Sequence, residues 1–325
     1  MKIAVLYSSD IQYGIIKGLE DQGHSIIPFY YGPNRKFLLL NLLYKFNKNL
    51  IKLSNVRLFN EKLIKLDRYY LQDPLDLILI IKGHKLNSRA ERILKSTKLK
   101  KIQWTIDTVK RWPGQATIFP YMDKVFFQDG SDIQLHHNGA WLPLGFDDEI
   151  FKYNSHKIID ILFIGNVTLP FYGKRKECFL RLAYLAKLGY KISFAGSSAD
   201  NELISVFNSN GVNIIGRQPL SKYAEIISQA RICINIHQND GGKAINPMFF
   251  AIPATGGLQL TDNYEYLTNW LIPYKHYYPT SPKTISDDIL PLLSMNCLPL
   301  KLAEEVAEKH SYRARAKRIL SNNNK

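Results

Sequence analysis

The stretch from Ala230 to Asp262 carries the residue types and spacing best suited to holding a phosphate group. A short apolar run over Ile232–Ile236 predicts a buried strand, a polar loop with Gly241 and Gly242 follows, and a helix is predicted over Pro247–Ala254. At such a junction, unpaired backbone N–H groups and the positive end of the helix dipole point at one spot, which suits a diphosphate. An ordinary strand-loop-helix connection explains the pattern as well, because the two glycines match neither the dinucleotide fingerprint nor the Walker loop.

Two further positions in the first half of the chain could meet the hydroxyl groups of a substrate. Asp107 follows a strand predicted over Lys101–Ile106, and His84 follows a nearly continuous apolar run over Leu75–Ile81. Ligands of open α/β sheets bind at the carboxyl ends of the strands. Asp107 is therefore a candidate base or acceptor-positioning group, with His84 behind it.

The opening of the chain has the same arrangement. A strand predicted over Lys2–Tyr7 leads through Ser8, Ser9 and Asp10 into a helix, and a second strand follows. Such a β-α-β start is typical of an open α/β sheet. Ser9 and Asp10 are then acceptor-side candidates, and an ordinary helix N-cap explains them as well.

A second α/β unit begins after a polar linker near residue 155. A strand over Ile158–Gly165 ends in Gly165-Asn166, and Lys174, Arg175 and Lys176 stand at the start of the next predicted helix, which runs to Leu188. Cations at a helix N-terminus oppose its dipole, so a bound anion would explain them, as would a solvated helix start. Arg175 is the cation we select for a diphosphate.

Composition limits the classes of function. The 325 residues suffice for two domains, and a net charge of +15 favours a phosphate-rich partner. Nucleic acid is unlikely as that partner, since no finger, helix-turn-helix or RNA-binding pattern occurs. Three widely spaced cysteines predict neither disulfides nor structural zinc, so we expect a reducing compartment.

Nine basic and two acidic residues lie between Arg35 and Arg68, mixed with leucines at near-helical spacing. This basic amphipathic segment could contact an anionic membrane, or it could be a core face with a solvated basic side. The N-terminus lacks a signal-peptide pattern, and no apolar run approaches the roughly 20 residues of a bilayer span. We expect a cytoplasmic protein, peripheral at the inner membrane face if the segment binds lipid.

The amino-acid sequence from Ala230 to Asp262 resembles that of one known family. Asn-Ile-His, an asparagine before a Phe-containing helix, Pro-Ala-Thr-Gly-Gly and Leu-x-Leu-Thr-Asp stand in the order found in the CgeB-like, spore-maturation-type glycosyltransferases. Three further segments are similar to that family. They are Trp104-x-x-Asp107, the segment Trp141–Phe151, which resembles the family's crossing between domains, and a closing helix with His310, Tyr312 and Arg315. The matches cover most of residues 100–320, and it is their order that carries the resemblance.

The resemblance implies an α/β protein with two Rossmann-like domains facing each other across a cleft, the GT-B type. An acceptor-side domain would span residues 1–150 and a nucleotide-sugar-binding domain 151–325, whose last helix could pack back toward the first. The implied reaction moves a sugar from a nucleoside-diphosphate donor to an unknown acceptor, without cofactor or metal. The donor would meet Gly165, Asn166, Arg175, Gly216, His237, Gly241, Gly242, Lys243, Asn246, Thr255 and Gly256.

The sequence departs from that family at two positions. The family carries an Arg and, three residues later, a Glu in the helix after the asparagine, and these positions are Met248 and Ala251 here. In many GT-B enzymes that Glu binds the donor ribose, and losing it would cost on the order of 1.5–3 kcal/mol of binding. A catalytically silent relative that binds nucleotide, glycan or a partner protein is therefore the alternative function.

Overall fold

The computed structural model describes residues 1–8, 13–32, 48–167, 173–198, 200–237, 242–262, 265–270 and 278–321. These residues divide into two compact units. The first contains the described residues of 1–144 together with 242–244 and 315–321, and the second those of 145–237 and 245–314. Each unit is built on its own six-stranded sheet.

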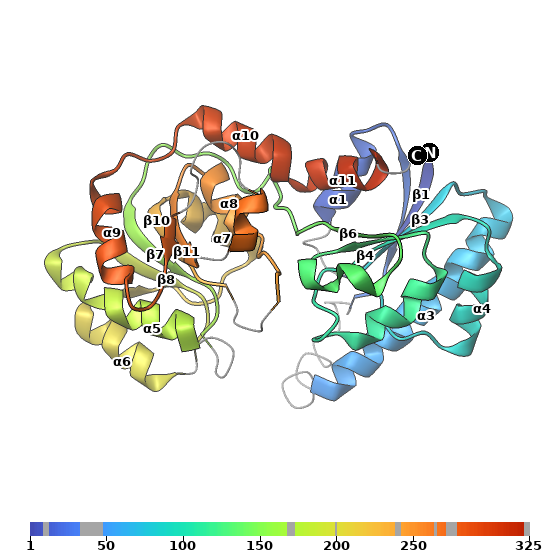
Figure 1. Cartoon of the computed structure of the whole chain (residues 1–325), viewed down its shortest axis with the longest axis horizontal. Coiled ribbons are helices and arrows are strands. Elements are labelled where there is room, and N and C mark those ends of the chain that lie inside the picture. The colour runs from blue at the N-terminus through green and yellow to red at the C-terminus, as the bar shows by residue number, and fades with distance from the viewer. Residues whose placement is uncertain are drawn as a thin grey trace. The chain divides into compact units, whose positions relative to one another are not determined.

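The first unit has a parallel sheet of order β2-β1-β3-β4-β5-β6 (Figure 1). Its strands are β1 (Lys2–Tyr7), β2 (Ser25–Tyr30), β3 (Leu77–Ile81), β4 (Lys100–Trp104), β5 (Lys124–Phe127) and β6 (Gly139–Trp141). Its helices are α1 (Tyr13–Glu20), α3 (Lys48–Gln72) and α4 (Ser88–Ser96), with 3-10 helices η2 (Pro113–Tyr121) and η3 (Gly130–Leu135).

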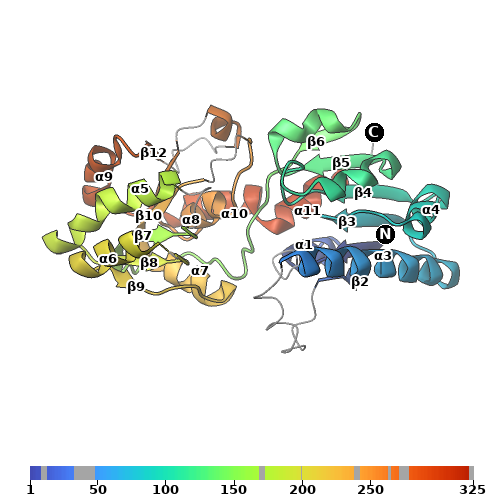
Figure 2. The same ribbon diagram turned by 90° about the horizontal axis from the view of Figure 1, so that it is seen from below.

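The sequence of the central strand β3 explains its place in the first sheet. All five residues, Leu-Ile-Leu-Ile-Ile, are buried, as expected for a parallel strand covered on both faces. Helix α3 packs against β1 and β2 and lies beside α4 (Figure 2). Phe59 and Leu63 of α3 are buried with Ile78 and Ile80 of β3 in one apolar core.

The second unit repeats the plan with a parallel sheet of order β12-β11-β10-β7-β8-β9. Its strands are β7 (Ile159–Ile164), β8 (Ile192–Ala195), β9 (Asn213–Ile214), β10 (Ala230–Asn235), β11 (Leu258–Asp262) and β12 (Tyr278–Thr280). Its helices are α5 (Gly173–Leu182), α6 (Asn201–Asn210), α7 (Leu220–Ser228), α8 (Met248–Ala254), α9 (Ile285–Ser294) and α10 (Leu300–His310), with 3-10 helices η4 (Ala183–Leu188) and η5 (Glu265–Trp270). Helix α11 (Tyr312–Ser321) ends the described chain, and its residues from Arg315 group with the first unit.

Aromatic packing fixes α5 and α6 to the second sheet. Phe163 of β7 stacks on Phe179 of α5 with ring centroids 4.7 Å apart, and it lies 5.7 Å from Phe207 of α6. Phe194 of β8 closes the cluster against Phe207. Such pairs add about 0.5–1.5 kcal/mol each beyond their area burial, so this cluster holds α5 in the position from which Lys174 and Arg175 reach the strand ends.

Two parallel sheets with alternating helices confirm the expected Rossmann-like architecture. One predicted element is different: the helix expected to run to Leu188 ends at Leu182, and a 3-10 turn η4 continues it to Gly189, which takes a left-handed conformation. Helix α3 occupies the second half of the basic segment 35–68, and its first half, 35–47, lies outside the described residues.

Candidate functional site

Each of the strands β7, β8 and β9 is followed by a turn that contains glycine. Gly165, directly after β7, has φ +101°, and Gly216, after β9, has φ +76°, so both adopt a conformation that favours glycine. The Gly196 N–H donates to the Gly216 carbonyl at 3.2 Å, and Asn166 Oδ1 accepts from the Ser197 hydroxyl at 2.8 Å. The predicted strand-end residues Gly165, Asn166 and Gly216 therefore lie along one edge of the second sheet.

Arg175 lies beneath these turns as a buried side chain, only 8% exposed. Its Nε donates to the Ile236 carbonyl at 3.0 Å, Nη2 donates to the same oxygen, and Nη1 donates to the Asn166 carbonyl at 2.6 Å. A Cβ at Gly165 would lie 2.8 Å from Nη1, so the close approach requires glycine. The solvated helix-start arginine considered from sequence is wrong, because this guanidinium ties the end of β10 to the turn after β7.

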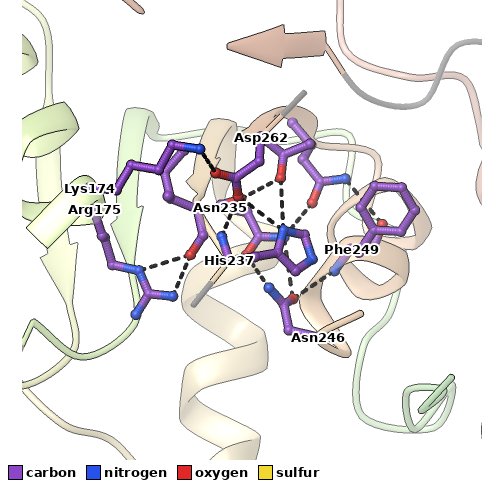
Figure 3. A network of polar contacts seen from close by, with 10 residues as sticks. Lys174, Arg175, Asn235, His237, Asn246, Phe249 and Asp262 are labelled. Carbon is purple, nitrogen blue, oxygen red and sulfur yellow. Dashed lines mark hydrogen bonds and ion pairs between the residues drawn. The ribbon is translucent and has the colours of Figure 1, made fainter. Parts of the chain in front are cut away.

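Its neighbour Lys174 makes a different contact (Figure 3). Lys174 Nζ lies 2.9 Å from Oδ1 of Asp262, the fully buried last residue of β11. The other oxygen, Oδ2, accepts from the His237 backbone N–H and lies 3.2 Å from His237 Nδ1. Lysine, aspartate and histidine thus form a chain of polar contacts across the ends of β10 and β11.

The carboxylate of Asp262 is kept ionised by its partners. Burial acts to raise its pKa, but the hydrogen bonds from His237 and Lys174 outweigh burial and hold the pKa below its ordinary value. A carboxylate oxygen can only accept, so Nδ1 of His237 is the donor of this hydrogen bond. Nε2 of His237 is buried and has no hydrogen-bond partner among the described residues, and the whole side chain is 4% exposed.

A second polar network fixes the start of α8 (Figure 3). Asn246 and Asn235 pair through their amides, with Asn246 Nδ2 donating to Asn235 Oδ1 at 3.0 Å, and Asn246 Oδ1 accepts from the Phe249 N–H at 3.1 Å. Asn235 Nδ2 donates to Gln259 Oε1 at 2.7 Å, and Gln259 Nε2 donates to the Phe249 carbonyl at 3.1 Å. Asn246 therefore anchors the loop end to β10 and β11.

Thr255 and Gly256 lie near the amino-terminal end of β11, which corrects the expectation that they pack beside a diphosphate at the carboxyl ends of the strands. Both residues lie between α8 and β11. The five residues of β11, at about 3.3 Å each, separate them from Asp262 by roughly 16 Å. Thr255 is fully buried, and its hydroxyl donates to the Ile252 carbonyl at 2.7 Å. Gly256 takes φ +85° to end the helix.

Gly242 and Lys243 also differ from the expected phosphate loop. Residues 242–244 group with the first unit, where the Lys243 N–H donates to Asp129 Oδ1 at 2.8 Å. A Cβ at Gly242 would collide with the same carboxylate. That backbone N–H is therefore bound to a protein carboxylate. Gly241 lies outside the described residues.

Helix α8 carries the two positions at which the sequence departs from the CgeB-like pattern. Ala251 is fully buried, as are all its neighbours from Phe249 to Ala254, while Met248 is half-buried. Phe250 stacks on His310 of α10 with ring centroids 4.3 Å apart. Ala251 therefore lies in a buried helix segment of apolar residues.

In the first unit, Asp107 is engaged by cations. Lys82 Nζ lies 2.9 Å from Asp107 Oδ2, and an Arg111 nitrogen lies 3.9 Å from Oδ1. The same lysine ammonium sits 4.0 Å above the centre of the Trp112 ring. A carboxylate paired in this way is better suited to positioning a hydroxyl than to removing its proton.

Lys82 has a backbone conformation that is rare for its type. Its φ is +72° at the end of β3, and Gly83 follows with φ +80°. Such a conformation costs a non-glycine residue of order 1 kcal/mol or more, and residues held in this way cluster at functional sites. Lys82 joins Asp107 as a candidate that spacing alone did not identify.

His84 lies close to this pair and is buried, with 6% of its side chain exposed. It packs edge-on against Tyr31 and Phe59, and its Nε2 has no hydrogen-bond partner among the described residues. Burial, aided by the Lys82 charge and opposed by Asp107, lowers the pKa of His84 to about 4. The imidazole is therefore neutral near pH 7. Ser9 and Asp10 lie outside the described residues.

Sequence reasoning did not select Asp262, Lys174 or Lys82. His237 follows β10 and Asp262 ends β11, and only the parallel pairing of these two strands brings the residues together. Lys174 stands next to Arg175 at the start of α5, and only the packed structure shows which of the two reaches Asp262. The left-handed backbone of Lys82 has no sequence signal.

The described residues contain neither a cluster of metal-ligating side chains nor a helix that could span a membrane. No three His, Cys, Asp or Glu side chains in the described ranges are grouped so that they could hold a metal ion. No helix in the same part of the chain is long and apolar enough to cross a membrane.

Comparisons with known proteins agree with the architecture. Residues 175–321 match the family model described as "Glycosyl transferase-like". No curated protein matches the sequence significantly. The matched region contains the Arg175, His237 and Asp262 positions and leaves the first unit almost entirely outside.

Solved structures of the same fold cover nearly the whole chain. AviGT4, a glycosyltransferase involved in avilamycin A biosynthesis, is 12% identical with a TM-score of 0.64 over 99% of this chain and 96% of its own. Anabaena HepE, solved in complex with UDP-glucose, is 10% identical with a TM-score of 0.59 over 99% of both chains. UDP-GlcNAc 2-epimerase from Neisseria meningitidis, solved with UDP-GlcNAc, is 12% identical with a TM-score of 0.58 over 99% of both chains. The fold is therefore of the GT-B type, with two Rossmann-like domains.

Proposed function

We propose that this chain is a hexosyltransferase of the CgeB-like type, which moves a sugar from a nucleoside-diphosphate donor to an acceptor. The observation that carries the proposal is the polar edge of the second sheet, where Lys174, Asp262 and His237 meet beside the glycine turn at Gly165. Open α/β sheets bind ligands at the carboxyl ends of their strands. The glycosyltransferase-like match over residues 175–321 covers this edge except for the turn.

The donor would lie along this edge with its nucleobase and ribose at one end and its diphosphate farther along. The turns at Gly165 and Gly216 suit a nucleobase and ribose, because a glycine backbone lets a ligand approach without a side chain in the way, and Asn166 lies directly after Gly165. Lys174 would meet the diphosphate at the start of α5, where the helix dipole also favours an anion. Arg175 would support this site by holding the turn and the end of β10 in place.

The acceptor would be bound by the first unit. Asp107 and Lys82 would position its hydroxyl, with the neutral His84 behind them, and Ser9 and Asp10 would complete the acceptor side. The domain roles follow: an acceptor domain of about residues 1–150 and a donor domain of about 151–325. Contact with an anionic membrane through the basic segment 35–68 would bring the enzyme to a lipid-linked or cell-surface acceptor. Neither a cofactor nor a metal is required.

A catalytically silent nucleotide or glycan binder is a second candidate, favoured by Ala251. The carboxylate that binds the donor ribose in many GT-B enzymes is replaced at this position by a fully buried alanine. Binding without turnover distinguishes this candidate from the enzyme.

A thermal-shift screen with UDP, GDP and ADP and with UDP-glucose, GDP-mannose and ADP-glucose tests the proposal. A ligand at 100 times its dissociation constant adds about 2.7 kcal/mol of stability, which raises the melting temperature measurably. Release of the nucleoside diphosphate from a binding nucleotide sugar then reports turnover. Stabilisation without release supports the silent nucleotide binder, and no stabilisation by any of the six compounds contradicts both the transferase and the nucleotide binder.

A pair of lysine variants places the site. Lys174→Met should weaken nucleoside-diphosphate binding roughly ten- to a hundredfold, as expected for a lost charge-assisted contact. Lys187→Met, at an exposed position in η4 of the same unit, is the matched control and should bind as the wild type does. Equal affinities of the two variants would remove Lys174 from the donor site.

A further inference from the structure

The unpartnered nitrogen of His237 is the strongest unexplained feature of the described residues. A buried polar atom without a partner costs about 1–3 kcal/mol, and native side chains at such positions are normally paired with protein, water or ligand. Nε2 of His237 has no partner among the described residues although the residue is only 4% exposed, and its other ring nitrogen lies 3.2 Å from Asp262 Oδ2. The imidazole is thus oriented by the protein through Nδ1, while its buried Nε2 has no hydrogen-bond partner among the described residues.

The chemistry of the missing partner follows from the tautomer. The Asp262 carboxylate can only accept, so the hydrogen bond at 3.2 Å is donated by Nδ1–H of His237. Lys174 Nζ, 2.9 Å from Oδ1, supplies the positive charge beside this carboxylate. In the Nδ1–H tautomer Nε2 is an acceptor, and the group that fits it is a neutral donor such as a hydroxyl.

The position of the His237 ring relative to the strands indicates which part of the donor supplies that hydroxyl. β10 and β11 lie on one side of β7, while β8 and β9 lie on the other. Strands are spaced by about 4.8 Å, so β8 and β10 are roughly 10 Å apart, with the Gly165 turn between them. A donor with its base at the β8 and β9 turns and its diphosphate near α5 would present its transferred sugar to the ends of β10 and β11.

We infer that His237 Nε2 accepts a hydrogen bond from a hydroxyl of the nucleotide-sugar donor, with Asp262 and Lys174 fixing the ring for that contact. This inference rests on the proposed function. The hydroxyl belongs to the transferred sugar by the strand order given above, and the ribose is the other source with the same chemistry. His237 is then a donor-specificity residue, and Asp262 is a positioning residue that acts through it.

The first arm of the test uses the wild-type protein with ¹⁵N-labelled histidine, so it does not depend on a variant that folds. The probes are UDP, GDP and ADP and the sugars UDP-glucose, GDP-mannose and ADP-glucose. Long-range proton–nitrogen spectra distinguish a bare Nε2, a hydrogen-bonded one and a protonated one. We expect the His237 Nε2 signal to shift on addition of the nucleotide sugar that binds, while keeping the character of an unprotonated nitrogen. An unmoved signal in a complex that calorimetry shows to be formed refutes the inference, as does a protonated Nε2.

The second arm compares dissociation constants of variants by calorimetry. His237→Phe keeps a planar ring without an acceptor and should weaken nucleotide-sugar binding roughly two- to tenfold, the range for one neutral hydrogen bond. His237→Gln, whose amide oxygen can take the place of Nε2, should recover part of the loss, and the exposed His156→Gln is the matched control with no change expected.

The two sources of the hydroxyl give different patterns. Weakening confined to the nucleotide sugar supports the transferred sugar, and equal weakening for the free diphosphate supports the ribose. Wild-type affinity of His237→Phe for both overturns the inference and leaves the proposed function standing. Absence of binding by the wild type overturns the proposed function itself.

Discussion

Replacing Arg175 by alanine tests the assignment of this side chain to the framework of the donor domain. The guanidinium donates to the Ile236 carbonyl through two nitrogens and to the Asn166 carbonyl at 2.6 Å. It is 8% exposed, so water would replace these contacts poorly. The Ile236 carbonyl belongs to a fully buried residue, so the loss of its partner costs about 1–3 kcal/mol, whereas water can reach the exposed Asn166. The lost packing of the Arg175 stem adds to this cost, so we expect Arg175→Ala to lower the free energy of unfolding by about 2–4 kcal/mol.

The matched control is Arg181→Ala in the same helix. Arg181 is half exposed and pairs with Glu177 at 3.1 Å, an i,i+4 surface pair worth about 0.3–0.5 kcal/mol. Both variants place alanine in α5, so they share the gain in helix propensity. Arg175→Lys retains one charge but cannot bridge the two carbonyls, and should lie between them.

Urea unfolding followed by circular dichroism measures the free energies, and amide hydrogen exchange in β7 and β10 locates the loss. Protection should fall first at the ends of these strands, where Asn166 and Ile236 lose their common partner. A free energy for Arg175→Ala within about 1 kcal/mol of that for Arg181→Ala would refute the framework role. The side chain would then be available to a bound diphosphate, as the sequence alone suggested.

Two further predictions concern buried groups. His84 has its pKa lowered from an ordinary 6.5 to about 4, so the folded state stays neutral while the unfolded state protonates, and stability present above pH 6.5 should fall by roughly 3 kcal/mol as the pH drops to 4. The urea-unfolding midpoint of His84→Gln should vary less with pH over that range than the wild-type midpoint does. The midpoint of the exposed His156→Gln should vary as in the wild type. A wild-type pH dependence in His84→Gln would show that other groups control it. Ala251→Glu should lower the free energy of unfolding by several kcal/mol, because its carboxylate would be buried among Phe249 and its neighbours without a partner, whereas Met248→Glu, at a half-buried position, should cost less. Tighter nucleotide binding by Ala251→Glu at an unchanged melting temperature would contradict the apolar packing at this position.

Local sequence patterns were sufficient for the architecture. Leu77–Ile81 and Ile161–Ile164 are apolar runs of strand length, and the segments between such runs have helical spacing, so two parallel sheets were predictable. The ends of the elements were less predictable. The strand expected over 101–106 spans Lys100–Trp104, although the Thr105 N–H still donates to the Phe126 carbonyl of β5 at 2.9 Å, and the chain bends at Ile106 and Asp107. Hydrophobicity indicates which residues are buried, and it carries little information on where a ladder of hydrogen bonds stops.

The sequence alone determined that a glycine-punctuated strand edge with nearby cations would exist, since both strand ends and charges are local features. It could not determine which cation does what. Lys174 and Arg175 are adjacent and both basic, yet one reaches the Asp262 carboxylate and the other the carbonyls of Asn166 and Ile236. Side chains on successive residues of a helix point about 100° apart, and only the packed strands decide what each direction meets.

Long-range partners depended entirely on the tertiary structure. His237 and Asp262 are 25 residues apart and meet because β10 and β11 are parallel neighbours that end together. Thr255 is closer to Asp262 in sequence, yet it lies at the opposite end of β11. The sequence therefore determined the kinds of residue that the edge would offer, and parallel strand pairing decided which of them could act on one ligand, because it joins residues by strand end rather than by distance along the chain.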